Sequence, residues 1–161
     1  MSNYGGAGLI LLSPDHESVL LVCDLRSKKW GFPKGHREPE DMDPIATATR
    51  ECEEETGITA SNYTLHGSPF RLAKSSGAYI FYYATAHTSN LTITPQASEI
   101  ETIAWVPIKD LIANPICGNK YLRVWIADMT IGSKRKSVGL YQALRLVSGE
   151  PPRSPHIVAH A

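Results

Sequence analysis

The chain has 161 residues, 42 % of them hydrophobic and 20 % charged, and its 16 basic and 16 acidic side chains cancel. These values are typical of one globular domain and exclude a disordered chain, a fibrous repeat and a membrane protein. No apolar run approaches the roughly 20 residues that cross a bilayer, and the N-terminus lacks the layout of a signal peptide. Cys23, Cys52 and Cys117 are too scattered for a disulfide framework or a zinc site. We therefore expect a cytoplasmic protein with three reduced, mostly buried thiols.

Charge is unevenly distributed along the chain. Residues 1–114 carry 9 basic and 14 acidic side chains, whereas residues 115–161 carry 7 basic and 2 acidic ones. An acidic region could hold metal and a basic region could hold phosphates. Uneven surface charge without a function explains the same pattern equally well.

The first segments of the chain predict a buried hairpin followed by a loop. Apolar runs at 8–12 and 19–23 have the length and composition of strands, and 13–16 between them reads as a turn. Residues 30–35 contain two glycines and one proline, which is typical of a loop.

A helix is predicted next, because Asp43 is a good N-cap and Pro44 suits the first helical position. The helix should run to about Thr56, where Gly57 is placed to end it. Its expected core-facing stripe consists of Ile45, Ala48, Thr49, Cys52 and Thr56.

The remaining segments alternate strands with helices. Strand-like stretches lie at 63–65, 70–72, 79–83, 91–94 and 103–106. Helices are expected from Pro107 through Leu111, over 121–129 and over 140–147. We expect one domain at 1–148 and a flexible tail at 149–161. This mixture predicts an α+β or α/β sandwich.

Four glutamates fall within residues 51–55. On a helix, Glu51, Glu54 and Glu55 share one face, so their charges should repel and raise one another's pKa. Divalent cations would remove this penalty, and carboxylate oxygens suit Mg²⁺. If only these three side chains are considered, a solvated acidic helix face is the simpler interpretation.

The surrounding sequence resembles the signature of the Nudix hydrolases, G-x5-E-x7-R-E-U-x-E-E-x-G-U, where U is apolar. Gly35 supplies the first glycine, and residues 50–58 match the second half throughout. Two departures occur: one extra residue separates Gly35 from Arg50, which an insertion at 42–43 would explain, and the upstream acidic position is Asp41. The resemblance covers roughly residues 5–115 and implies an α/β/α sandwich with a mixed β-sheet.

The resemblance also implies roles for the helix residues. Glu51, Glu54 and Glu55 would be ligands of Mg²⁺, with Mn²⁺ as a substitute. Glu54 or Glu55 would take a proton from water, and Arg50 would orient a carboxylate of the site through a salt bridge. A plain surface ion pair is the alternative for Arg50.

Further site residues lie outside the helix. The resemblance implies that Gly35 and the backbone near Glu38 contact metal or phosphate, and that Lys34 neutralises phosphate charge. A solvated lysine is the alternative for Lys34. Glu99 precedes a predicted strand, where many Nudix enzymes carry a catalytic or metal-binding glutamate. Glu101 competes with it for that role, and an exposed loop carboxylate is the other interpretation.

Substrate contacts are harder to predict. Tyr79, Phe81 and Tyr83 share one face of a strand and could stack a base, although core packing is the other use for such a row. The string at 30–36 resembles that of the diadenosine tetraphosphate, diphosphoinositol polyphosphate and mRNA decapping hydrolases. Basic side chains that could meet RNA or extra phosphates are Lys120, Arg123, Lys134, Arg135 and Lys136.

The resemblance supports three functions. The first is a Mg²⁺-dependent pyrophosphohydrolase of nucleoside polyphosphates, above all a dinucleoside polyphosphate such as diadenosine tetraphosphate. The second is removal of the cap from capped RNA, which the zero net charge and the absence of a separate N-terminal helical domain disfavour. The third is a silent module that binds nucleotide or RNA, which the three retained glutamates disfavour. No membrane partner is expected, and the sequence leaves the oligomeric state open.

Overall fold

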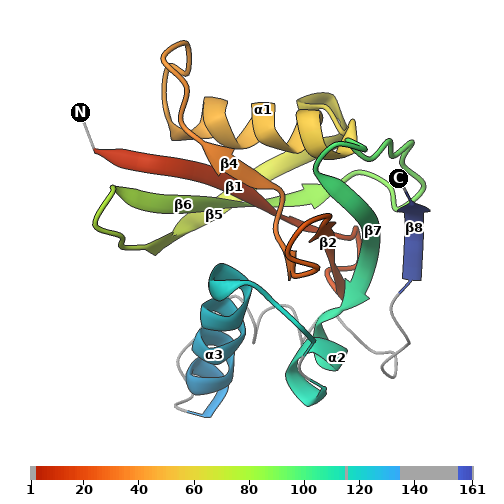
Figure 1. Cartoon of the computed structure of the whole chain (residues 1–161). Coiled ribbons are helices and arrows are strands. Elements are labelled where there is room, and N and C mark those ends of the chain that lie inside the picture. Colours follow the sequence, from red (N-terminus) through yellow and green to blue (C-terminus); the bar gives the residue numbers. More distant parts are fainter. Residues whose placement is uncertain (1–2, 115, 135–155, 161) are drawn as a thin grey trace.

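The computed structural model describes residues 3–114, 116–134 and 156–160. Within these residues the chain forms one eight-stranded mixed sheet with four helical segments (Figure 1). The strands are β1 (Tyr4–Leu12), β2 (Ser18–Asp24), β3 (Trp30–Gly31), β4 (Lys34–His36), β5 (Tyr63–Leu72), β6 (Ala78–Ala86), β7 (Ile100–Pro107) and β8 (His156–His160). The helices are α1 (Pro44–Thr56), the 3-10 turn η1 (Ala60–Asn62), α2 (Ile108–Ala113) and α3 (Lys120–Lys134).

The sheet is built around β1, in the strand order β5-β6-β1-β2-β7-β8. The predicted hairpin of β1 and β2 is confirmed, with Leu12 opposite Val19, and β1 also pairs in parallel with β6. Figure 1 shows α1 on one side of the sheet and α3 on the other. Because both faces are covered, β1 and β2 are apolar on both sides and not alternating. The predicted α/β sandwich with a mixed sheet is therefore confirmed.

Two hydrophobic clusters fill the two sides of the sheet. The cluster on the α1 side includes Ala48 and Cys52 of the helix, and the cluster on the α3 side includes Leu122, Trp125 and Met129. The apolar spacing that predicted a helix over 121–129 thus marks the buried face of α3. Its N-terminus is fixed by Asn119, whose Oδ1 accepts the Leu122 N–H at 3.0 Å.

The bounds of α1 are those predicted. Asp43 Oδ1 accepts the Ala46 N–H at 2.8 Å, and Gly57 ends the helix with φ 77°, a left-handed conformation that favours glycine. The predicted buried stripe was partly wrong, because Ile45 is exposed and Thr49 lies at the margin. Thr47 and Glu55 are buried in addition, since each contacts the segments at 34–41 that pack beside the helix.

Three segments differ from their predicted form. The glycine-rich stretch at 30–35 contributes the two short strands β3 and β4, while 63–65 and 70–72 belong to the single strand β5, whose register shifts after His66. Residues 91–94 are not a strand. The Thr94 N–H donates to the Thr56 carbonyl at 2.9 Å, so this segment covers the end of α1 and not a sheet edge.

The C-terminal region contributes one strand to the sheet. His156–His160 form β8, which pairs antiparallel with β7, where the sequence predicted a flexible tail from 149 onward. The expected helix at 140–147 and the rest of the tail lie outside the described residues. In the described part of the chain, no helix has the length and apolar character needed to span a membrane.

Candidate active site

Arg50 and Asp41 form the centre of the acidic region on α1. Arg50 Nε donates to Asp41 Oδ1 and Nη2 donates to Asp41 Oδ2, both at 3.0 Å. Asp41 also accepts the Glu38 N–H at 2.8 Å and the Thr47 hydroxyl at 2.7 Å. The hydrogen bond from Arg50 is the main reason why the pKa of Asp41 lies well below its usual range. Asp41 therefore anchors Arg50 and the loop that precedes α1.

The extra residue in this loop does not disturb the helix. Met42 is 90 % exposed between Asp41 and the N-cap Asp43, and α1 begins at Pro44. Glu38 approaches Arg50 Nη1 at 3.5 Å with an exposed side chain, while its backbone N–H is already bonded to Asp41. An insertion at 42–43 stays a prediction.

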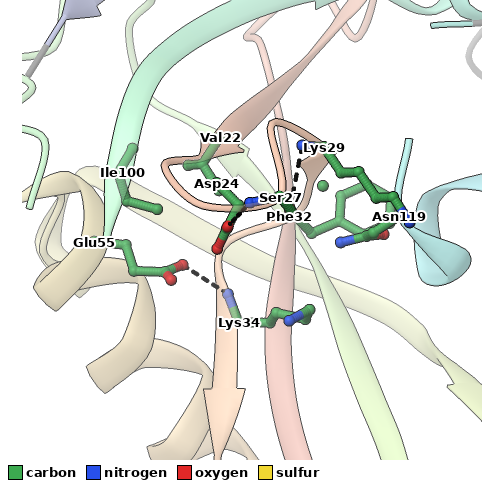
Figure 2. A pocket seen from close by; sticks show the side chains of 10 residues that line it. Val22, Asp24, Ser27, Lys29, Phe32, Lys34, Glu55, Ile100 and Asn119 are labelled. Carbon is green, nitrogen blue, oxygen red and sulfur yellow. Dashed lines mark hydrogen bonds between the residues drawn. The ribbon is translucent and has the colours of Figure 1, made fainter. Parts of the chain in front are cut away.

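The three helical glutamates lie in three different environments. Glu54 has a side chain that is 45 % exposed and pairs with Arg50 at 3.2 Å, whereas the Glu51 side chain is 12 % exposed and pairs with Arg50 at 2.9 Å. Glu55 is only 8 % exposed, and its Oε1 accepts the backbone N–H of Lys34 at 3.0 Å (Figure 2). The carboxylates therefore range from solvent-exposed to buried along one helical turn.

Gly35 is required by the position of Glu51. A Cβ atom built on Gly35 would overlap the Glu51 carboxylate, so any side chain here would displace it. Gly35 lies on β4, which pairs with β1 through Gly6, Ala7 and Gly8. The first glycine of the motif thus allows α1 to approach the sheet with its carboxylates facing β4.

Burial controls the ionisation of two of these carboxylates. Removal from water raises the pKa of Glu55 to about 8, and the negative charges of Glu51 and Glu99 contribute to the same shift. Burial is also the largest cause of the raised pKa of Glu51, while Arg50 opposes it. Mutual repulsion, which the sequence predicted as the cause, is the smaller effect.

Glu55 faces a hollow of about 240 Å³ whose walls are polar and apolar in similar measure (Figure 2). Its lining residues are Val22, Asp24, Ser27, Lys29, Gly31, Phe32, Lys34, Glu55, Ile100 and Asn119. Asp24 is held by the N–H groups of Arg26 and Ser27 at 3.0 and 2.8 Å. The Asn119 side chain packs on Gly31, where a Cβ would overlap it. Residues of opposite charge therefore line one hollow.

The sequence predicted only Lys34 and Glu55 among these lining residues as parts of a site. Asp24 is the first polar residue after the apolar run of β2, and Asn119 has the residue type of a helix N-cap, so both carried a local signal. Neither signal connects them to Glu55. Lys29 gave no signal at all, because only the fold of the β2–β3 turn brings it to the hollow.

The predicted aromatic platform is a packed cluster. Tyr79, Phe81 and Tyr83 do lie on one face of β6, but Phe81 is completely buried and Tyr79 stacks on Tyr121 with centroids 4.9 Å apart. Tyr83 accepts the indole N–H of Trp125 at 3.0 Å. Of the two uses that the sequence left open for this row, core packing describes Tyr79 and Phe81.

Glu99 and Glu101 lie in different surroundings. Glu101 pairs with Lys28 at 3.0 Å, near the turn that follows β2. Glu99 is exposed, directly precedes β7 and contributes to the raised pKa of both Glu51 and Glu55. Of the two, Glu99 is therefore the residue whose charge acts on the acidic site.

A divalent cation would need this acidic group to rearrange. In the described ranges no three His, Cys, Asp or Glu side chains form a ready metal-binding group, and the Arg50 guanidinium bonds both Glu51 and Glu54. The donors are nonetheless hard carboxylate oxygens, and burial of Glu51 and Glu55 leaves their charge poorly solvated. The exposed side chain of Glu54 can turn at little cost. The residues therefore fit a hard divalent cation.

The basic residues near the C-terminus are only partly described. Lys120 and Arg123 are exposed on the first turn of α3, and Lys134 is its last residue. Arg135 and Lys136 lie outside the described residues, so the expected contact of this group with RNA or phosphate stays a prediction. Of the thiols, Cys23 and Cys52 are buried and Cys117 is exposed.

Comparisons with known proteins place these features in one family. The family model described as the NUDIX domain matches residues 4–129. The chain is 33 % identical over 136 residues to the m7GpppN-mRNA hydrolase dcap-2 of Caenorhabditis elegans, covering 77 % of this chain and 17 % of that relative. It thus spans well under a fifth of the length of that relative. A putative mRNA-decapping protein of Acanthamoeba polyphaga mimivirus is 45 % identical over 40 residues, which are 25 % of this chain and 11 % of that protein.

Solved structures share the fold. A C. elegans Ap4A hydrolase in a binary complex superposes with a TM-score of 0.64 at 21 % identity, covering 81 % of this chain and 98 % of that one. A NUDIX-family hydrolase from Clostridium perfringens gives a TM-score of 0.63 at 20 % identity, covering 92 % and 100 %. At these identities the likeness concerns the fold alone.

Proposed function

The chain belongs to the Nudix hydrolase superfamily, and from this premise we propose that it is a Mg²⁺-dependent pyrophosphohydrolase that cleaves a phosphoanhydride bond of a nucleoside polyphosphate. The observation that carries the proposal is the placement of Glu55. This buried carboxylate faces the same hollow as Lys34 and Lys29, next to Glu51 and Arg50. A site with acidic and basic walls suits a metal ion on one side and phosphates on the other.

In the proposed reaction, water attacks one phosphorus of the linkage and the second phosphate leaves. A bound divalent cation would neutralise phosphate charge and make the attacking water more acidic. Glu51, Glu54 and Glu55 would hold the cation, and Glu54 or Glu55 would accept the proton from water. Lys34 neutralises charge on the phosphate chain, while Arg50, fixed by Asp41, keeps the carboxylates of α1 in place.

The favoured substrate is a dinucleoside polyphosphate such as diadenosine tetraphosphate. The hollow of about 240 Å³ is below the usual size of a pocket for a whole ligand of this kind, so it would take one end of the molecule. The remainder would extend along the surface beside Lys34. Gly35 and the loop at Glu38 border this path on the side of α1.

Capped RNA is the second candidate, and the likeness to dcap-2 favours it. A cap also joins two nucleosides through a polyphosphate bridge, so the chemistry of the cleaved bond is the same. The two substrates differ in the polymer attached to one nucleoside, which would need a basic surface beyond the site. Lys120 and Arg123 on the exposed side of α3 are available for such a contact.

The test is a turnover assay with wild type, Glu54→Gln and the control Glu53→Gln, each with Mg²⁺, with Mn²⁺ and with chelator. The panel contains diadenosine tetraphosphate, ATP, ADP-ribose and m7G-capped RNA. We expect hydrolysis of diadenosine tetraphosphate that needs the cation and falls on the order of 10²–10³-fold in Glu54→Gln, by analogy with loss of one charge-stabilising group. Glu53 is exposed and outside the site, so its variant should keep wild-type rates.

Two results would change the proposal. Release of m7GDP from capped RNA faster than hydrolysis of the free dinucleotide would select decapping. A folded protein that turns over no member of the panel would contradict hydrolysis and favour a module that only binds nucleotide or RNA.

A further inference from the structure

Two threonines of α1 direct their hydroxyl groups differently. The Thr49 hydroxyl donates to the carbonyls of Ile45 and Ala46 at 3.0 and 3.1 Å, inside the helix itself. Helical threonines commonly bond back to their own helix in this way. The Thr47 hydroxyl instead donates to Asp41 Oδ2 at 2.7 Å. It therefore connects α1 to the loop that precedes the helix.

The Thr47 oxygen has a second partner, which comes from β1. The Tyr4 hydroxyl lies 2.9 Å from Thr47 Oγ1, and this contact is buried. Asp41 is paired with Arg50, so its carboxylate is ionised and only accepts hydrogen bonds. Because the single hydroxyl proton of Thr47 is used on Asp41, the Tyr4 O–H must be the donor to Thr47. Tyr4 thus favours the orientation in which Thr47 serves Asp41.

Tyr4 is itself firmly held at the start of β1. Its side chain is buried, and the guanidinium carbon of Arg37 lies 4.8 Å from its ring centroid. The Arg37 N–H donates to the Gly5 carbonyl at 3.0 Å, which ties the loop before α1 to the same strand. The Tyr4 hydroxyl is therefore a fixed point of the sheet, against which α1 packs (Figure 1).

The plane of the Arg50 guanidinium is set by Asp41. The Asp41 side chain is 5 % exposed and accepts two hydrogen bonds from Arg50, through Nε and Nη2. Because a guanidinium is planar, this bidentate contact fixes the direction of its remaining nitrogen, Nη1. Nη1 donates to Glu51 at 2.9 Å and to Glu54 at 3.2 Å. A turn of the Asp41 carboxylate would therefore move the donor that gathers these two glutamates.

We propose that Tyr4 is a positioning residue of the cation site, because its hydroxyl keeps the Thr47 proton on Asp41. Asp41 in turn holds the Arg50 guanidinium, which gathers two helix carboxylates for a divalent cation. We call Tyr4, Thr47, Asp41 and Arg50 the Tyr4 relay. The identity of the cation site rests on the proposed function, whereas the relay of hydrogen bonds does not.

Loss of the Tyr4 hydroxyl gives Thr47 a local alternative. Its hydroxyl could then donate to the Asp43 carbonyl, which lies four residues earlier and already accepts the Thr47 N–H at 3.2 Å. Asp41 would lose one donor, and its carboxylate would turn more freely. The expected consequence is a less ordered Arg50 and weaker binding of the cation, while the phenyl ring of Tyr4→Phe keeps the packing.

The first test observes Arg50 directly. The Nε–H signal of Arg50 is recorded in ¹H–¹⁵N NMR spectra without divalent cations and is assigned by its loss in Arg50→Lys. Tyr4→Phe and Thr47→Val should shift this signal and speed its exchange with water, while Thr47→Ser, which keeps the hydroxyl, should restore it. An Arg50 signal that is unchanged in both Tyr4→Phe and Thr47→Val would overturn the relay.

The chain offers a matched control for each change. Tyr82→Phe removes a hydroxyl from a half-buried tyrosine that packs against the cluster on the α1 side. Thr49→Val removes a hydroxyl that bonds only within α1 among the described contacts. Both controls should leave the Arg50 signal as in wild type. Equal shifts in Tyr4→Phe and Tyr82→Phe would overturn the proposal, because they would indicate a general effect of packing.

The second test measures the affinity for Mn²⁺ by electron paramagnetic resonance, without substrate. We expect Tyr4→Phe to weaken binding roughly fivefold, the effect of one hydrogen bond, and both controls to stay within about twofold of wild type. Since Tyr4 acts through Thr47, Tyr4→Phe combined with Thr47→Val should bind no more weakly than Thr47→Val alone. Unchanged or tighter binding in Tyr4→Phe, or additive losses in the double variant, would overturn the proposal.

The third test uses turnover of diadenosine tetraphosphate. Tyr4→Phe should lower the rate roughly fivefold at limiting Mg²⁺, and saturating Mg²⁺ should restore it, because only cation binding is weakened. A loss that saturating Mg²⁺ does not restore would contradict this role for Tyr4. Mn²⁺ binding by a wild type that hydrolyses no substrate would contradict the proposed function alone, and the NMR and Mn²⁺ measurements would still decide on the relay.

Discussion

The two sides of the sheet hold charged groups by different means. On the α1 side, acidic groups are held by hydrogen bonds from the Arg50 guanidinium and from the backbone N–H of Lys34. On the α3 side, Lys34 and Lys74 lie over the rings of Tyr79 and Tyr121, and neither forms an ion pair among the described residues. Direct hydrogen bonds thus hold the acidic groups, whereas aromatic rings support the two ammonium groups. Lys34 contributes to both, through its backbone and its side chain.

The largest expected effect comes from the acidic side. Glu55→Gln should lower kcat on the order of 10²–10³-fold, since the amide keeps the shape and can still accept the Lys34 N–H but has no charge. Steady-state kinetics with diadenosine tetraphosphate and Mg²⁺ measures this loss. Glu53→Gln is the control on the same helix. A Glu55→Gln enzyme with at least half of the wild-type rate would show that the buried carboxylate is structural.

The next effect concerns the anchor of Arg50. Asp41→Asn should lower the free energy of unfolding by roughly 1–3 kcal/mol, because it removes the bidentate partner of a partly buried guanidinium that keeps Glu51 and Glu54. Urea unfolding at neutral pH measures the change. Glu40→Gln makes the same chemical change at an exposed position of the same loop and should stay within about 0.5 kcal/mol of wild type. Equal stability of the two variants would mean that the Asp41 pair contributes nothing.

The last expected effect is a slope of stability with pH in the absence of divalent cations. Burial raises the pKa of Glu55 in the folded chain to about 8, above its ordinary 4.5, so the folded state holds this proton more tightly than the unfolded state. The contribution to stability is complete below pH 4.5 and is lost as pH rises toward 8, by at most about 1.4 kcal/mol per pH unit.

This slope is isolated by comparing urea unfolding of wild type and Glu55→Gln across that pH range. The difference between the two curves should change with pH in favour of the variant at the alkaline end. Parallel curves would contradict a buried, protonated Glu55. Glu53→Gln should run parallel to wild type, since its carboxylate is exposed.

Much of the acidic site was predictable because its signals are local. The N-cap Asp43, the terminating Gly57 and the spacing of Glu51, Glu54 and Glu55 all act within one helix, where periodicity fixes relative position. What the periodicity does not specify is how the helix is rotated against the sheet, and for this reason the burial of Glu55 and the exposure of Ile45 were missed.

The basic side was not predictable, because its members are distant in the sequence. Lys34, Lys74, Tyr79 and Tyr121 come from two strands, a turn and a helix, and both lysines belong to residues 1–114, which carry excess acidic residues. Likewise, the alternation at 91–94 indicated a strand, but hydrogen bonding to the end of α1 placed it elsewhere.

The sequence alone therefore determined the family, the sandwich of strands and helices and the order of acidic residues on α1, since these depend on short-range spacing. Only the tertiary structure decided which carboxylate is removed from water and which lysines meet. Both outcomes depend on the packing of segments far apart in the chain, where burial and neighbouring charge set the free energy of each group.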